Sequence, residues 1–224
     1  MTTEHPLDSD RVLALSYVHA ARRAALAALW RLDLALGAVV ARGREPMIGR
    51  IKLAWWRDAL AALDVAAPPP EPLLQAVGRD LVSPGLLRGA ELAAMEEGWS
   101  CLLTPEPLTA AEMDAYAAGR GGLLFGHSAR LLKAEASAEL VQAGEAWALV
   151  DLARRSSSAP EREAALQAAR ARSWPQMRWP SKLRPLGMLA VLARRDAEAR
   201  AGGLEKQGSP SRMLRMVRHR LSGR

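Results

Sequence analysis

The sequence has 224 residues; half are hydrophobic, a quarter are charged, and the formal net charge is +7 with a pI near 10.4. This composition is typical of a globular protein, and the length is ample for a buried core. The basic balance favours an anionic partner such as acidic lipid, nucleic acid or a diphosphate, without choosing among them. A solvated arginine-rich surface explains the same charge.

The features that report on the compartment point to the cytoplasm. Cys101 is the only cysteine, so no internal disulfide can form and a reducing compartment fits. The first ten residues, MTTEHPLDSD, are acidic and lack an apolar core, so we do not expect a signal peptide. No stretch of about 18 uncharged apolar residues occurs, so we expect no membrane-spanning helix.

Alanine and leucine dominate the chain, which favours helix over sheet. The first helix is predicted to begin at the cap residues Ser9 and Asp10. Proline and glycine divide the rest into further helices. These are predicted at 22–42, 46–64, 73–81, 84–103, 109–132, 138–155, 161–173, 186–201 and 209–224. With no strand pattern, repeat or long linker, the prediction is one all-α domain over residues 1–224.

The segment from 109 to 132 combines a clear start with an unusual middle. Thr109 and Glu112 match a capping box, which satisfies backbone amides at a helix start. Four glycines follow and weaken the helix, at a cost of about 1 kcal/mol each. They indicate either close helix packing or room for a ligand, and close packing is the better explanation because glycine relieves crowding. The four are Gly119, Gly121, Gly122 and Gly126.

The helix predicted at 46–64 contains adjacent tryptophans, Trp55 and Trp56. Two apolar stripes cover most of its circumference, one with Trp55 and one with Trp56, so both rings are predicted to lie in the core. The remaining narrow face carries Arg50 and Arg57. An arginine on a mostly buried helix needs an anionic partner, and an internal salt bridge is favoured over a bound ligand.

Several segments match one family in order along the chain. RAALAALWRLDLALGAVV (23–40) and EPMIGRIKLAWWRDALAAL (45–63) form the most specific block. YAAGRGGLL (116–124), GEAWALVDLAR (144–154) and LRPLGMLAVLARR (183–195) are weaker matches. Together they resemble the squalene/phytoene synthase family. The WWRDA block is similar to a divergent branch that includes bacterial phytoene synthase-like proteins and mitochondrial complex I assembly factors.

The resemblance implies an isoprenoid-synthase-type helical bundle around a central cavity. Active members join two prenyl diphosphates, and Mg²⁺ ions bridge these diphosphates to two aspartate-rich motifs. By resemblance and helix geometry, Arg50, Arg57 and Arg154 are candidates for diphosphate or anion contacts. The residues placed at the cavity are Asp33, Gly37, Tyr116, Gly119, Gly122 and Asp151.

Both aspartate-rich motifs are missing at the matching positions. The first falls on residues 37–41, GAVVA, which contain no metal ligand. In the second, Asp151 replaces an asparagine, Arg154 keeps the family arginine, and Arg155 replaces the first aspartate. Asp33 lies one turn before the first motif. It is interpreted either as a single remaining metal ligand or as one partner of a helix salt bridge, and the salt bridge is favoured. The sequence therefore predicts no metal site and no cofactor.

The expected function is a non-catalytic protein that binds an isoprenoid or lipid, or assists assembly of a protein client. The alternative is an active prenyltransferase of isoprenoid biosynthesis that uses Mg²⁺ through unrecognised ligands. A helical interaction module unrelated to prenyl chemistry is a third hypothesis, favoured by a filled cavity.

The C-terminal segment 209–224, SPSRMLRMVRHRLSGR, predicts a basic amphipathic helix. Leu214, Val217 and Leu221 line one side, and arginines crowd the rest. Such a helix can lie on an anionic membrane, so a peripheral membrane contact is one hypothesis. A terminal helix docked by its apolar edge is the other. Aromatic residues for stacking are lacking, so we expect no nucleic acid partner.

Overall fold

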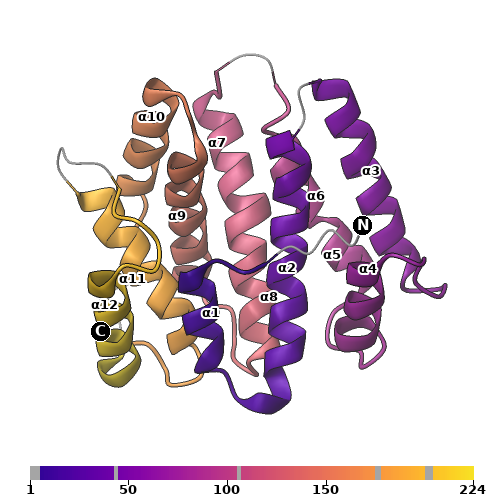
Figure 1. Ribbon diagram of the computed structural model, residues 1–224, viewed down its shortest axis with the longest axis horizontal. Helices are drawn as coiled ribbons and strands as arrows, with labels where there is room; N and C mark the ends of the chain where they lie inside the picture. Colours follow the sequence, from indigo (N-terminus) through magenta and orange to yellow (C-terminus); the bar gives the residue numbers. More distant parts are fainter. Residues whose placement is uncertain (1–5, 43–44, 105–106, 175–177, 200–203) are drawn as a thin grey trace.

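The computed structural model describes residues 6–42, 45–104, 107–174, 178–199 and 204–224. These residues form helices joined by short loops, with no strand in the described ranges (Figure 1). The all-α prediction is confirmed. The helices are α1 Ser9–Ser16, α2 Ala20–Arg42, α3 Pro46–Ala62, α4 Pro72–Val77, η1 Gly78–Val82, α5 Gly89–Ala93, α6 Met95–Ser100, α7 Ala110–Tyr116, η2 Ala117–Gly122, α8 Leu123–Leu131, α9 Ala138–Arg155, α10 Ala159–Arg170, α11 Arg184–Glu198 and α12 Pro210–Ser222.

The helices surround a central column in which α7, η2 and α8 run on from one another (Figure 1). On one side of this column lie α3, α4, α5 and α6. On the other side lie α9, α10 and α11, with α12 at the outer edge next to α1. Helix α2 runs beside the central column and packs on α8, on α3, α4 and α6, and on α1 (Figure 1). The functional site described below lies where α2, η2 and α9 approach one another.

Helix α2 departs from the prediction that no segment of the chain is apolar enough to span a membrane. Its span Ala20–Ala41 is long and apolar enough to cross a membrane by length and composition, with mean hydropathy 1.7. However, 56% of this span is buried inside the bundle, and core helices of soluble proteins pass the same test. Its apolar character is therefore explained by burial among neighbouring helices.

The glycine-rich segment serves close packing at the centre of the bundle. A Cβ atom built on Gly119 would lie 2.8 Å from the Cα of Gly98 on α6. On the other side of η2, Gly121 meets the backbone of Gly144 on α9. The segment is π-helical, a distortion that often marks functional sites. The close-packing interpretation is confirmed for these glycines.

Several details of the helix starts differ from the prediction. The cap of α1 is Asp8, whose carboxylate accepts a hydrogen bond from the backbone N–H of Arg11 (2.9 Å), and Ser9 and Asp10 lie inside the helix. The helix expected from residue 84 begins at Gly89, because Pro84 and Gly85 form a turn in which Gly85 has a φ of +67°. The capping box of Thr109 and Glu112 is confirmed.

The prediction that both tryptophans of α3 lie in the core is half wrong. Trp56 is 9% exposed and faces the bundle, whereas Trp55 is 48% exposed. Ile48 and Ile51, which share the stripe of Trp55, are also exposed. Only one of the two apolar stripes is buried because α3 packs on the bundle from one side.

Candidate functional site: a buried network of arginines and aspartates

Asp33 on α2 and Asp151 on α9 meet at the centre of the bundle, with Arg120 of η2 between them. Nε and Nη2 of Arg120 donate to the two carboxylate oxygens of Asp33, at 2.9 and 3.1 Å. Nη2 also donates to Oδ2 of Asp151 at 2.7 Å. Asp33 and Arg120 are fully buried, and Asp151 is 6% exposed. One guanidinium therefore neutralises carboxylates from two helices far apart in sequence.

Two further arginines complete this central network. Nη2 of Arg11 on α1 donates to Oδ2 of Asp33 at 2.7 Å. Nε of Arg155 donates to Oδ2 of Asp151, one helical turn away, at 2.8 Å. Arg11 is buried, whereas the side chain of Arg155 is 48% exposed. Three guanidinium groups thus serve two carboxylates, and the charged groups are paired as burial requires.

Aromatic rings enclose the guanidinium of Arg120. Its Cζ lies 4.2 Å from the ring centroid of Trp99 and 4.9 Å from that of Trp147. The hydroxyl of Tyr116, one turn earlier on the same face, accepts a hydrogen bond from Nη1 of Arg120. A cation over a desolvated aromatic face is stabilised electrostatically. The guanidinium of Arg120 is therefore fixed by two carboxylates, one hydroxyl and two aromatic rings of the protein.

The electrostatics of the central network favour its ionised form. Burial alone would raise the pKa of Asp33, but Arg120 and Arg11 outweigh this effect and lower it below the usual value. Burial likewise acts to raise the pKa of Asp151, and Arg120 and Arg155 reverse it. Burial raises the pKa of Tyr116 to about 12, so its hydroxyl stays neutral. Both carboxylates are therefore charged at neutral pH.

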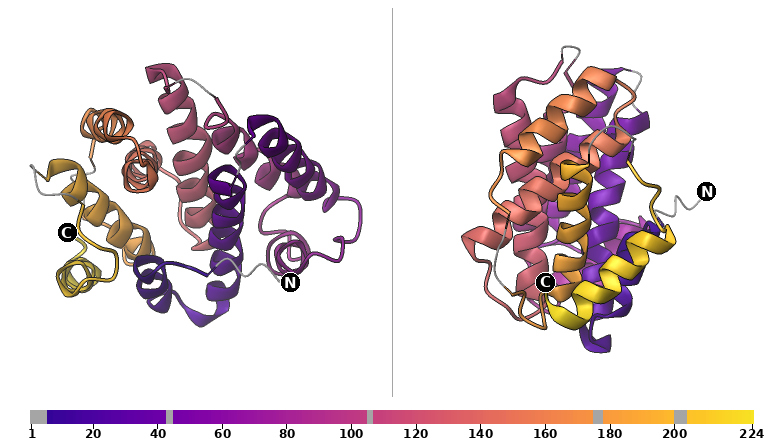
Figure 2. Two further views of the ribbon diagram at one scale, coloured as in Figure 1. Left: turned by 45° about the horizontal axis from the view of Figure 1, so that its top comes forward. Right: turned by 90° about the vertical axis from the view of Figure 1, so that its left-hand side faces the viewer.

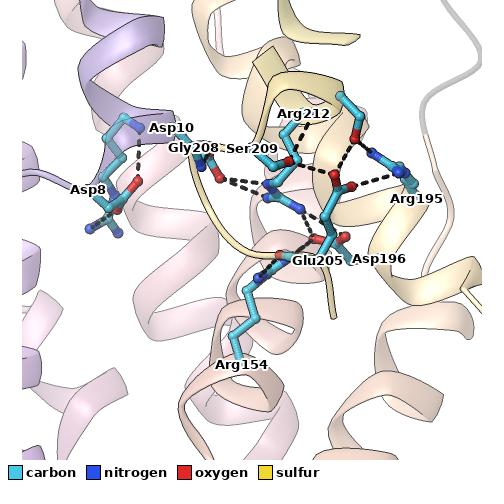
Figure 3. A network of polar contacts seen from close by, with 11 residues as sticks. Asp8, Asp10, Arg154, Arg195, Asp196, Glu205, Gly208, Ser209 and Arg212 are labelled. Carbon is cyan, nitrogen blue, oxygen red and sulfur yellow. Dashed lines mark hydrogen bonds and ion pairs between the residues drawn. The ribbon is translucent and has the colours of Figure 1, made fainter. Parts of the chain in front are cut away.

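A second network ties α12 to the bundle (Figure 3). Arg212 donates from Nε and Nη2 to Oδ2 of Asp10 on α1, at 3.1 and 2.8 Å. Nη1 of Arg212 donates to both carboxylate oxygens of Asp196 on α11, at 2.9 and 2.8 Å. Arg154 donates to Asp196 as well, and to the backbone oxygen of Glu205. Arg212, Asp10 and Asp196 are all less than 5% exposed.

A small cavity lies between the two networks. Its lining includes Asp151 and Arg11 of the central network and Asp196 and Arg212 of the second. Its volume is about 20 Å³, room for roughly one water molecule. This space does not admit an isoprenoid chain.

The family model for squalene/phytoene synthase matches residues 5–171, about three quarters of the chain. The chain belongs to the squalene/phytoene synthase family. Its helical architecture is the all-α isoprenoid synthase fold of that family. Searches among curated proteins and among solved structures each gave no match. The segments after residue 171, including α11 and α12, lie beyond the matched region.

The family implies a Mg²⁺ site, and the residues present do not fit one. Mg²⁺ takes oxygen ligands in octahedral geometry, often from carboxylates. Asp33 and Asp151 come from the expected helices and face one another, but Arg120 bonds to both. Within the described ranges, no group of three or more His, Cys, Asp or Glu side chains could hold a metal ion. The oxygens of these two carboxylates are bonded to a guanidinium, which a cation would have to displace.

The three arginines expected to contact an anion do not converge. Arg57 bonds to its neighbour Asp58 at the surface, and Nη2 of Arg50 donates to the backbone oxygen of Leu103 (3.1 Å). Arg154 lies across the bundle from α3 and bonds to Asp196. Each of the three therefore has a protein partner. Their proposed role in ligand binding stays a prediction.

The residues expected at the cavity line a filled interior. The six-membered ring of Trp99 lies against Gly37, where the nearest ring atom would be 2.6 Å from an added Cβ. Tyr116 is fully buried beside Arg120. An added Cβ on Gly122 would lie 3.2 Å from Val141. The structure thus brings Asp33, Gly37, Tyr116 and Asp151 to one region, occupied by aromatic and arginine side chains.

All three arginines of the central network were missed as site residues, and Arg155 was noted only as the replacement of a family aspartate. Arg120 lies four residues after Tyr116 and so shares its helix face, a spacing that places it at the expected cavity. A charged residue among four glycines was the available signal. Arg11 carries no comparable signal, because its contact with Asp33 depends on how α1 packs against α2.

Proposed function

We propose that this protein is a non-catalytic member of the squalene/phytoene synthase family. The observation that carries the proposal is Arg120, which bonds to Asp33 and Asp151 at the centre of the fold. Metal-dependent ionisation of a prenyl diphosphate needs carboxylates that hold cations against the departing diphosphate. Here both central carboxylates hold guanidinium groups of the same chain.

Because side chains fill the region where the family would bind its substrate, we propose that ligands or partners bind at the surface. Aromatic and arginine side chains fill the region between α2 and α9, and the neighbouring cavity holds about 20 Å³. A bound lipid or a protein client would then contact the outside of the bundle. The role we propose is a binding or assembly function in which the family fold serves as a rigid scaffold.

The alternative, an active prenyltransferase, has one observation in its favour. Asp33 and Asp151 do face one another from α2 and α9, as metal-binding carboxylates of this family would. Catalysis would require Arg120 and Arg11 to leave them. Their departure would leave the buried Asp33 without an arginine and Asp151 with Arg155 alone, which is strongly unfavourable and argues for the non-catalytic role.

Incubation of the purified protein with farnesyl or geranylgeranyl diphosphate and Mg²⁺ tests the proposal. We expect no diphosphate release above the rate without protein. Sustained Mg²⁺-dependent release that is lost in an Asp151→Asn variant would establish the enzyme instead.

A further inference from the structure

Large hydrophobic side chains are exposed on two faces at opposite ends of the molecule. One face belongs to α3, and the other is shared by α1 and α12 (Figure 1). Nine of the ten such side chains that the described ranges expose lie on these two faces. The α1–α12 face carries Val12, Tyr17, Met213, Leu214 and Leu221, and the α3 face carries Met47, Ile48, Ile51 and Trp55.

The apolar edge of α12 is not used to hold the helix in place. Helix α12 docks through Arg212, Met216 and His219, which are each less than 4% exposed. Leu214 and Leu221 are instead 71% and 74% exposed. The helix lies across the outside of the bundle, in front of the other helices when that side is viewed (Figure 2). Its docking therefore leaves a second, apolar edge facing outward.

An apolar groove lies between α1 and Met213 of α12. Leu7, Val12, Leu13 and Met213 line it, together with the small polar residues Ser9 and Ser16. The groove has a volume of about 360 Å³ and opens to the outside. An open, mostly apolar hollow at a surface suits a hydrocarbon segment better than a polar ligand.

The charged side chains of α12 are basic. Helix α12 contains four arginines and no acidic residue. Arg215 and Arg218 are exposed, and within the described ranges neither forms an ion pair. The guanidinium of Arg220 lies 5.5 Å from the ring of Tyr17.

The nearby acidic groups already have partners. Asp10 and Asp196 bond to Arg212. Glu205 bonds to Arg195 and to the hydroxyl of Ser209. The outward charge of the face is therefore basic.

We propose that the α1–α12 face docks on the surface of an anionic phospholipid bilayer. Exposed Leu214, Leu221 and Met213 would enter the boundary between headgroups and acyl chains, and Arg215 and Arg218 would contact lipid phosphates. The inference rests on the proposed binding role and adds the surface and the lipid class. It combines the exposed apolar side chains of α12 with unpaired arginines on the same helix, which neither a neutral bilayer nor a soluble anion would use together.

The α3 face supplies a matched control. Ile51 is 63% exposed, close to the exposure of Leu214, and its surroundings include Lys52. Helix α3 differs from α12 in carrying an acidic residue, Asp58, which pairs with Arg57. Because Ile51 and Leu214 are both exposed, we expect that substitution of either by glutamate leaves the buried core intact.

Flotation of the full chain with vesicles tests the inference. We expect binding to phosphatidylcholine vesicles that contain phosphatidylglycerol, weak binding to phosphatidylcholine alone, and weakening by salt. Leu214→Glu should weaken binding at least about tenfold, since it loses apolar burial and adds repulsion. Arg215→Gln should weaken it about fivefold. Ile51→Glu should leave it unchanged.

Two results would overturn the inference. One is no binding of the folded wild-type chain to anionic vesicles at low salt. The other is an equal loss for Ile51→Glu and Leu214→Glu. Either result leaves the non-catalytic proposal standing, because that proposal depends on diphosphate release and not on vesicles.

Discussion

Arg120 is the single residue on which the central network depends. An Arg120→Met variant leaves Asp33 and Asp151 buried with fewer partners, since Arg120 contributes bonds to both. Removal of one partner from a buried ion pair costs about 3–5 kcal/mol. We expect a loss of that size in the free energy of unfolding, measured by urea denaturation at pH 7.

Arg155 provides the comparison for this experiment. Its side chain is half exposed, and Asp151 keeps Arg120 when Arg155 is removed. Arg155→Met should therefore cost about 1 kcal/mol or less. Equal costs for the two variants would contradict a special role for Arg120.

Tyr116 gives the central network a signature at high pH. Its folded pKa is about 12, whereas an unfolded tyrosine titrates near 10. Because the folded value is raised, the associated stability is fully present below about pH 10 and is lost as the pH rises towards 12. Absorbance titration should show a tyrosine that ionises near pH 12 and disappears in Tyr116→Phe. A variant titration identical to that of the wild type would refute the buried hydroxyl.

The sequence predicted part of this site. Asp33, Tyr116 and Asp151 were placed at the centre by their spacing and by the family resemblance, and the structure brings them together there. The partner that joins them was not predicted. The spacing from Tyr116 indicated the helix face on which Arg120 lies, but not its partners, because these depend on which helices pack opposite.

At the scale of elements, the contact of η2 with α6 depends on glycine. Gly119→Ala would place a Cβ 2.8 Å from the Cα of Gly98, and backbone cannot move aside as a flexible side chain can. Overpacking of this kind costs about 1–3 kcal/mol. Thermal unfolding should therefore show a lower Tm for Gly119→Ala.

Gly126 on α8 is the control glycine. The nearest atom to a Cβ added there lies 4.0 Å away, which is an ordinary contact. Gly126→Ala should raise stability by up to about 1 kcal/mol, because alanine is the better helix former. The account is contradicted if Gly126→Ala lowers the Tm while Gly119→Ala leaves it unchanged, because Gly126 would then be the crowded position.

Most helices could be predicted because proline and glycine mark their ends and apolar spacing marks their faces. Helix α3 shows the limit of this approach. Its two apolar stripes satisfied the pattern of a helix buried on all sides, yet only the stripe of Leu53, Trp56 and Leu60 is buried. Periodicity reports which side chains are apolar, whereas the number of packed neighbours is set by the tertiary arrangement.

At the scale of the whole molecule, the two buried networks hold the matched family region and the C-terminal helices together. The central network joins α1, α2, η2 and α9, and the network of Arg212 joins α12 to α1 and α11. The basic character of α12 was predicted from the sequence, but the burial of Arg212 was not. The buried aspartates that pair with Arg212 come from segments 202 and 16 residues away.

Calorimetric titration with geranylgeranyl diphosphate, with and without Mg²⁺, tests the central claim most directly. If Arg120 holds Asp33 and Asp151 as the structure describes, Mg²⁺ should add no measurable affinity, because both carboxylates are already bonded to a guanidinium. Tight binding that appears only with Mg²⁺ would contradict the account, since it would require Asp33 and Asp151 to release their arginines.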